Sequence, residues 1–252
     1  MFTKAGTIGF VACLLFRVAT AADPGAEFRF DHISLEHGLS QSSVLSLVED
    51  QAGFPWIATE QEVDRFDGFE VDTLRYAPGE SDSLTHSSVR SLLVDHTGAL
   101  WVGTWDGLNR IDAGDLSIRR FMAPSPFDQA PFSVQADGLA QACEDRLLVH
   151  TRTGLWWLDL ASQNQELTPL VSQTLDRSSL PQSWQAVGSR AAWLANARTL
   201  WRLDCQNMRL EKIEQLHPDS QPIRERSRNQ LARLPDGRLL WASVPRRKSC
   251  KI

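Results

Sequence analysis

The chain has 252 residues, of which 42% are hydrophobic and 23% charged, and its formal net charge at pH 7 is −5. These ordinary globular values exclude a disordered chain, a collagen, a coiled coil and a protein with several membrane spans. The net acidity argues against a nucleic-acid partner, because phosphate binding needs a clustered excess of Lys and Arg.

The first residues have the features of an export signal. Met1 to Lys4 form a short basic start, and Ala5 to Phe16 form an apolar run that is shorter than the span of about 20 residues that crosses a membrane. Ala19-Thr20-Ala21 has the small-x-small pattern of a signal peptidase site. We therefore expect residues 1–21 to be a cleaved signal peptide, with an uncleaved anchor as the alternative.

A repeat of about 45 residues organises the rest of the chain. Shifting the sequence by 45 residues superimposes the segment from Ser42 on the segment from Ser87. The coinciding pairs include Val44/Val89, Leu47/Leu92, Asp50/Asp95, Gly53/Gly98, Trp56/Trp101, Arg65/Arg110 and Asp67/Asp112. In weaker copies further along, Leu148, Trp193 and Trp241 take the position of the repeated Trp. Such a period indicates a modular array in which each unit is one supersecondary element.

The residue pattern inside a unit is that of strands. The alternation of side chains and the turn residues predict strands over 44–49, 54–59, 63–66 and 69–75 in the first unit. Four short antiparallel strands per 45 residues are typical of a β-propeller blade. We therefore predict an all-β fold, a β-propeller of four-stranded antiparallel blades. The expected blades lie near 28–76, 77–121, 132–168, 180–213 and 228–244, and a basic irregular tail covers 245–252.

The repeated residues have structural roles in this prediction. Trp56 and its equivalents are expected to pack between neighbouring sheets, each worth roughly 2–3 kcal/mol by transfer bookkeeping. Asp50 and Asp95 are expected to be turn residues, not acid/base groups. Glu62 stands where the second unit has a turn glycine, so we expect this turn to have another shape. The glycines expected at positive φ are Gly53, Gly98, Gly107 and Gly154.

Three cysteines lie beyond the signal segment, at positions 143, 205 and 250, without a C-x-x-C pair. This pattern supports neither a metal site nor a disulfide framework. We expect Cys143 and Cys205 to be two separate buried thiols, with one bridge between them as the alternative.

No catalytic, cofactor-binding or metal-binding residues are predicted. The six histidines, at 32, 37, 86, 96, 150 and 217, show no paired metal spacing, and the chain has no nucleophile elbow or phosphate-cradling glycine loop. His32, His37 and His86 are expected to be solvated residues of loops or strand edges.

Two stretches resemble a known family. The segment FDHISLEHGLSQSSVLSLVEDQAGFPWIATEQEVDRFDGFEV and the following LRYAPGESDSLTHSSVRSLLVDHTGALWVGTWDGLNRID resemble the two-component regulator propeller repeat. The most specific residues are Gly38-Leu39-Ser40, the D-x-x-G-x-x-W run, and the motif from Gly103 to Arg110. The resemblance is close over Phe28 to Asp112 and weaker as far as Trp241.

The resemblance implies the periplasmic sensor part of a hybrid histidine kinase or a diguanylate cyclase. In that family the propellers bind a small-molecule or carbohydrate ligand, and the full-length receptor is a homodimer held in the inner membrane by segments downstream of the propellers. Because the units amount to about four and a half blades, we expect a truncated product with an incomplete ring that lacks its output module.

Three functions from different classes are open at this stage. The favoured one is a ligand-sensing propeller, for which Trp105 and Arg90 are suggested binding residues. The alternatives are a periplasmic propeller enzyme, such as a lyase or hydrolase, and an extracytoplasmic interaction scaffold. The sequence identifies neither the ligand nor the output module.

Overall fold

The structure is a computed structural model that describes residues 32–112, 114–122, 131–170, 183–187, 190–195, 199–215, 227–233 and 239–245, without the side chains of 137, 183–187, 214–215, 227–233 and 239–245. From Ile33 onward these residues belong to one compact unit, Ile33–Ile252. The predicted signal peptide, 1–21, lies outside the described residues. Of the predicted tail only Pro245 is described, and it is the last residue of a strand.

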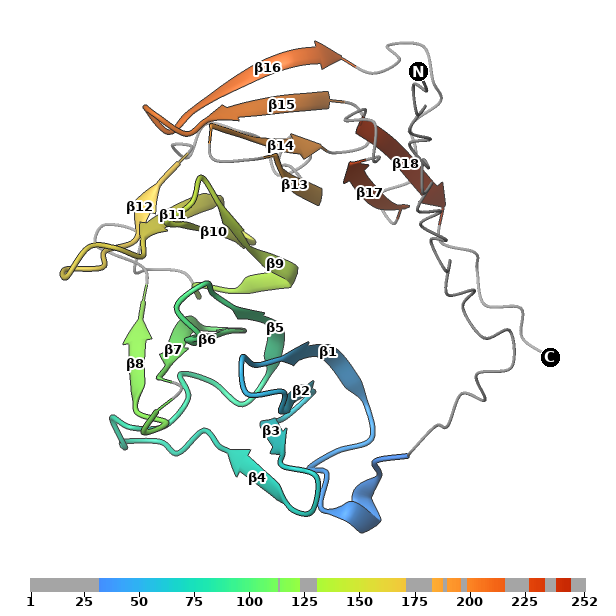
Figure 1. Ribbon diagram of the computed structural model, residues 1–252, viewed down its shortest axis with the longest axis vertical. Helices are drawn as coiled ribbons and strands as arrows, with labels where there is room; N and C mark the ends of the chain where they lie inside the picture. The colour runs from blue at the N-terminus through green and yellow to red at the C-terminus, as the bar shows by residue number, and fades with distance from the viewer. Residues whose placement is uncertain are drawn as a thin grey trace, which may run out of the picture. The chain divides into compact units, whose positions relative to one another are not determined.

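The described residues form antiparallel meanders in chain order (Figure 1). A short 3₁₀ turn, η1 (Leu35–His37), precedes the first sheet. The first sheet has the order β1-β2-β3-β4 and the second β5-β6-β7-β8. Their strands are β1 (Val44–Glu49), β2 (Pro55–Thr59), β3 (Val63–Phe66), β4 (Val71–Leu74), β5 (Val89–Val94), β6 (Leu100–Thr104), β7 (Gly107–Ile111) and β8 (Ile118–Phe121).

The third sheet has the order β12-β11-β10-β9, the fourth β13-β14-β15-β16, and β17 pairs with β18. Their strands are β9 (Val134–Ala142), β10 (Arg146–Thr151), β11 (Leu155–Asp159), β12 (Thr168–Pro169), β13 (Ser183–Val187), β14 (Ala191–Ala195), β15 (Thr199–Asp204), β16 (Arg209–Gln215), β17 (Ser227–Arg233) and β18 (Leu239–Pro245). The described residues contain no α-helix, and no helix among them is long and apolar enough to cross a membrane.

Successive sheets touch through their first strands. β1 contacts β5, β5 contacts β9, β9 contacts β13, and β13 contacts β17. Four-stranded meanders that meet through the first strand are the arrangement of propeller blades. The predicted all-β propeller fold is therefore confirmed.

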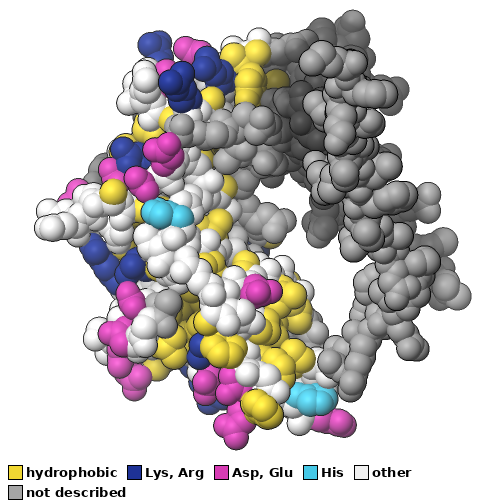
Figure 2. All heavy atoms as spheres, viewed as in Figure 1, with side chains coloured by type: hydrophobic (Ala, Val, Ile, Leu, Met, Phe, Trp, Pro, Cys, Tyr) yellow, Lys and Arg dark blue, Asp and Glu magenta, His cyan; other side chains and the backbone are white. Residues whose placement is uncertain are grey.

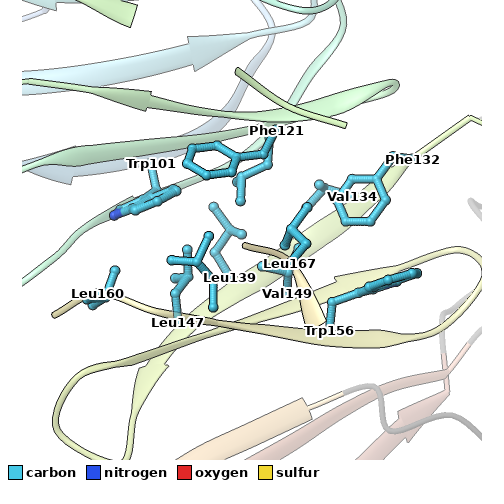
Figure 3. Close-up of a cluster of buried hydrophobic side chains, with 12 residues drawn as sticks. Trp101, Phe121, Phe132, Val134, Leu139, Leu147, Val149, Trp156, Leu160 and Leu167 are labelled. Carbon is cyan, nitrogen blue, oxygen red and sulfur yellow. The ribbon is translucent and has the colours of Figure 1, made fainter. Parts of the chain in front are cut away.

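The repeated tryptophans fill the space between sheets, as predicted. Trp56 is 3% exposed and packs with Leu92 and Val102 of the second sheet. Trp101 is fully buried and packs against the third sheet, where Figure 3 shows it beside Phe121 and facing Leu147. The ring centroids of Trp101 and Phe121 are 5.4 Å apart. Each of these tryptophans therefore joins its own sheet to the next.

Trp193 departs from this pattern. It keeps the register of the repeat, since it pairs with Arg202 as Trp101 pairs with Arg110. However, Trp193 is only half-buried, whereas Ala192 and Leu194 on either side of it are fully buried. In the fourth sheet the core residues are therefore the neighbours of the repeated position.

The first turn of the first and second units is built around an aspartate. Asp50 Oδ1 accepts hydrogen bonds from the backbone N–H groups of Ala52 and Phe54, and Asp95 Oδ1 does the same for Thr97 and Ala99. Gly53 and Gly98 have φ of 89° and 90°, as predicted. Pro55 is the first residue of β2, a position where its missing N–H is tolerated.

The second turn has two forms. Gly107 has a φ of 120°, as predicted, and donates its N–H to Phe132 O in the loop that enters the third sheet. Glu62 and Gly154 have no positive φ and donate instead to the side-chain oxygens of Thr59 and Thr151. The expectation of another shape at Glu62 is confirmed, but the positive φ expected at Gly154 is wrong, because this turn follows the first unit and not the second.

A disulfide bridge joins the third and fourth sheets, so the expectation of two separate thiols is wrong. Cys143 lies in the turn after β9 and Cys205 directly after β15. These turns lie on the same edge of neighbouring sheets, which brings the Cα atoms to 5.2 Å, within bridging range. The two cysteines are 62 residues apart in the sequence, so the sequence alone did not show that their turns lie side by side.

Candidate ligand-binding face

The connections between strands lie on two opposite edges of the sheets. Because strand direction alternates, the turns β2–β3, β6–β7 and β10–β11 lie on the same edge as the connections that lead into β1, β5 and β9. We call this the loop edge. The turns β1–β2, β5–β6 and β9–β10 lie on the opposite edge, here called the turn edge, together with the disulfide bridge.

Polar clusters hold the loops of the loop edge in place. In the first sheet, the fully buried Asp64 of β3 accepts hydrogen bonds from the backbone N–H and the hydroxyl of Ser40, at 2.8 Å and 2.6 Å. Its other oxygen accepts the Thr73 hydroxyl at 2.7 Å. The connection into β1 is therefore fastened to the centre of its own sheet.

The second sheet repeats this arrangement with an amide. Asn109, also fully buried, accepts the Thr85 N–H at 2.9 Å and donates to Thr85 Oγ1 at 3.0 Å. Thr85 Oγ1 also lies 2.9 Å from Thr104 Oγ1. Asp64 and Asn109 occupy the same repeat position. Both accept the backbone N–H of a residue in the preceding loop, although one acceptor is a carboxylate and the other an amide.

The third sheet lacks the equivalent polar group. Trp156 takes the position of Asn109 and donates its indole N–H to Thr151 Oγ1 at 3.2 Å. Ser133, which takes the position of Ser88, is 1% exposed, and its hydroxyl has no hydrogen-bond partner within the described part of the chain. The third unit therefore replaces the polar cluster with aromatic packing, in which Trp156 and Phe132 meet edge to face at 5.4 Å.

Arg120 of β8 fixes the long connection into β5. Its Nε donates to Ser83 O at 2.6 Å, and a terminal nitrogen donates to Ser83 Oγ at 2.6 Å and to Leu84 O at 3.2 Å. The same nitrogen also donates to Glu80 O. This loop leads to His86, whose ring stacks on Tyr76 with centroids 6.0 Å apart.

Three residues from two sheets meet beside this loop. The Cζ atom of Arg90, in β5, lies 4.7 Å from the ring centroid of Trp105, in the β6–β7 turn. The Cζ atom of Arg152, in the β10–β11 turn, lies 5.2 Å from the same centroid. Both distances are within the range of cation–π attraction. We call these three residues the Arg–Trp–Arg cluster.

Backbone hydrogen bonds fix the cluster in position. Trp105 donates its N–H to Ser88 O at 2.9 Å, and Arg152 donates its N–H to Ser133 O at 2.9 Å. Between them, Asp106 Oδ1 accepts the Phe132 N–H at 2.9 Å. The turn of the second sheet is thus joined to the loop that enters the third.

The structure brings together the two suggested residues, Trp105 and Arg90. Sequence reasoning missed Arg152, which occupies the same turn position in the third unit as Trp105 does in the second. The available signal was this equivalence, with Arg152 four residues after Leu148 as Trp105 is four residues after Trp101.

The histidines have several environments. His37 Nδ1 accepts the Ser34 N–H at 3.2 Å, and His86 Nδ1 accepts the Ser88 N–H at 2.9 Å. His96 lies on the turn edge, with Nε2 3.2 Å from Asp145 Oδ1. Burial lowers the pKa of His150 to about 4. His32 is exposed, and His217 lies outside the described residues. Over the described ranges no three His, Cys, Asp or Glu side chains are grouped to hold a metal.

The comparisons with known proteins agree with this fold. Residues 83–106 match the sequence profile of the family described as two component regulator propeller. The match contains Arg90 and Trp105 and ends at the β6–β7 turn. The chain therefore carries a two-component regulator propeller repeat. A comparison with curated proteins gave no significant match.

Several solved structures have a similar fold. The extracellular domain of the hybrid two component system BT3049 from B. thetaiotaomicron is 20% identical with a TM-score of 0.63, and the match covers 84% of this chain and 29% of that one. The extracellular domain of BT4673 from the same organism is 16% identical with a TM-score of 0.59, over 84% and 30% of the two chains. Virginiamycin B lyase from Staphylococcus aureus is 16% identical with a TM-score of 0.56, over 79% and 62%. This chain spans less than a third of the BT3049 and BT4673 extracellular domains.

Proposed function

We propose that the chain is the ligand-sensing propeller portion of a receptor of the two-component type, with a small molecule or carbohydrate as ligand. The observation that carries the proposal is the family match over 83–106, because it covers the loop and strands that place Arg90 and Trp105 on the loop edge. Two solved structures with a similar fold are extracellular domains of hybrid two component systems. Output would come from a histidine kinase or diguanylate cyclase of the same receptor, acting as a homodimer.

The proposed location is the periplasm, after removal of a signal peptide over 1–21. The Cys143–Cys205 bridge supports this location, because disulfides persist in oxidising compartments and are rare in the cytosol. The extracellular origin of the similar receptor domains points the same way.

We propose that this propeller binds its ligand without transforming it. The Arg–Trp–Arg cluster on the loop edge presents two arginines and an indole. Arginine stays protonated at neutral pH and is a poor proton-transfer group. A lyase or hydrolase activity remains the alternative for the test.

Titration calorimetry of the chain against a sugar library tests the proposal. We expect at least one sugar to bind with a heat that disappears in Trp105→Ala. A matched control is Trp157→Ala, because Trp157 also lies under an arginine, Arg146, at 5.0 Å, but in the middle of β11 and not in a turn of the loop edge. Turnover of the bound sugar would show that the chain is an enzyme and contradict the sensing proposal. If no sugar binds, the sensing proposal is also contradicted.

A further inference from the structure

The Arg–Trp–Arg cluster concentrates positive charge on the loop edge. Both guanidinium carbons lie within about 5 Å of one indole centroid, so they are at most about 10 Å apart. This is no more than the Debye length of about 10 Å at 0.1 M ionic strength, so the two charges repel each other. Arg90 is half-buried, which limits the screening of its charge by water.

These two arginines differ from Arg65 and Arg146, which also lie over aromatic rings but are each paired with a carboxylate. Arg65 lies over Phe54 and is 3.7 Å from the Asp50 carboxylate. Arg146 lies over Trp157 and forms an ion pair of 2.6 Å with Asp159. Within the described ranges, by contrast, neither Arg90 nor Arg152 is paired with a carboxylate.

The nearest acid in the sequence does not neutralise the cluster. Asp106 follows Trp105 directly, but its Oδ1 accepts the backbone N–H of Phe132 at 2.9 Å. One carboxylate against two guanidinium groups leaves a net positive charge at the cluster.

We propose that the Arg–Trp–Arg cluster binds an oxyanion, and specifically the carboxylate of a small-molecule ligand. This inference rests on the proposed sensing function and narrows its ligand to an anionic one. A planar guanidinium donates two parallel N–H bonds to a carboxylate, and two guanidiniums on one ring present such forks from neighbouring sheets. The indole beside them offers an apolar surface to the rest of the ligand.

The packing prepares the cluster for such a ligand. Stacking on Trp105 restricts both arginine side chains before the ligand arrives, which reduces the conformational entropy lost on binding. The backbone bonds from Trp105 to Ser88 and from Arg152 to Ser133 fix the two turns that carry the side chains. An anion bridging Arg90 and Arg152 would join the second sheet to the third.

The test uses the whole chain labelled with 5-fluorotryptophan. The ¹⁹F resonance of Trp105 is assigned with Trp105→Phe, and the chain is titrated with sodium D-glucuronate, D-glucose and inorganic phosphate at constant ionic strength. We expect glucuronate to shift the Trp105 resonance and glucose to leave it unchanged. Arg90→Gln and Arg152→Gln should each weaken glucuronate binding about 10- to 100-fold, as expected for a lost charge-assisted hydrogen bond.

The matched control is Arg119→Gln. Arg119 also lies over an aromatic ring, Phe121, at 5.0 Å, but it is on the outer strand β8 and donates to Gln165 O. This variant should bind glucuronate as the parent chain does. If the paired N–H groups of the guanidinium bind the carboxylate, Arg152→Lys should also weaken glucuronate binding. This variant keeps the positive charge but loses the paired donors.

The outcomes separate the inference from the proposed function. If glucose shifts Trp105 as strongly as glucuronate, or both Gln variants bind normally, the anion inference is wrong while sensing stands. If phosphate shifts Trp105 and glucuronate does not, the cluster binds an inorganic anion and the carboxylate assignment is wrong. If no probe moves Trp105 but a neutral sugar binds in the calorimetric library, sensing stands at another site and the inference fails.

Discussion

The indole N–H of Trp101 donates to Oδ2 of Asp95 over 2.8 Å, and both residues are buried. The same bond joins Trp56 to Asp50 at 2.9 Å in the first unit. The aspartate thus closes a turn with one oxygen and fixes the tryptophan with the other. This relationship explains why the two residues recur together, six positions apart.

The first prediction concerns this bond. Asp95→Ala should lower the free energy of unfolding by about 2–4 kcal/mol, because it leaves the Trp101 indole and the N–H groups of Thr97 and Ala99 without their acceptor. Urea unfolding followed by circular dichroism measures the loss. The control is Asp67→Ala, an exposed turn aspartate that bonds only backbone N–H groups, and it should cost less than about 1 kcal/mol. Equal losses in both variants would contradict a special role of the indole bond.

The second prediction concerns the disulfide. Reduction of the Cys143–Cys205 bridge should lower the free energy of unfolding by about 4 kcal/mol, because the bridge closes a loop of 62 residues in the unfolded chain. Urea unfolding with and without reductant measures this. The double variant Cys143→Ser/Cys205→Ser should be as unstable as the reduced chain and insensitive to reductant. A parent chain that is equally stable in both conditions would count against the bridge.

The third prediction concerns acid. Burial lowers the pKa of His150 to about 4, below its ordinary value of 6.5. Between these two pH values His150 is protonated in the unfolded chain and neutral in the folded chain. The stability that comes from a neutral His150 is complete above pH 6.5 and is lost as the pH falls toward 4, by up to about 3 kcal/mol. Unfolding at pH 7 and pH 5 should differ more in the parent chain than in His150→Gln. The exposed His37→Gln serves as the control and should keep the parent's pH dependence.

The fourth prediction concerns the second turn. Gly107 has φ of 120°, and a Cβ there would lie 2.7 Å from Thr85 Oγ1 and 2.8 Å from Thr85 Cβ. Gly68 has φ of 99° and open space around it. Gly107→Ala should therefore cost about 1–3 kcal/mol more than Gly68→Ala, because both carry the backbone strain and only one meets a neighbour. Thermal unfolding of the pair decides this, and equal costs would mean that Thr85 moves aside freely.

Much of the fold follows from local patterns in the sequence. The strands of the first unit and the burial of Trp56 and Trp101 depend on alternation and on the repeat, which a single chain displays. The bonds from Ser40 to Asp64 and from Thr85 to Asn109 were not predicted, because each joins a loop to a strand 24 residues away. Their residue types also differ, so the repeat conceals their equivalence.

The candidate site was predicted only within one unit. Trp105 and Arg90 lie in the well-preserved second unit, whereas Arg152 lies in a copy whose marker is Leu148 and not Trp. The contact also crosses from one sheet to the next, and sequence periodicity gives the content of each sheet but not the side chains that meet between sheets. The same limit applies to the Cys143–Cys205 pair.

The exposed side chains of β1 have a related consequence. Val44, Leu45 and Leu47 are 49%, 46% and 63% exposed, and Figure 2 shows hydrophobic side chains gathered over this strand. Ser46, between them, turns the other way and accepts the Leu92 N–H. The first sheet therefore packs against the second sheet, while its strand β1 exposes several aliphatic side chains.

The separation of the two edges bears on how such a chain can change over generations. The covalent tie and the His96–Asp145 pair lie on the turn edge, whereas the Arg–Trp–Arg cluster lies on the loop edge, at the far ends of the same strands. Under the proposed function, substitutions at the Arg–Trp–Arg cluster would alter ligand binding and leave the disulfide and the His96–Asp145 pair in place. The ligand preference of such a chain could then change over generations without loss of these two contacts.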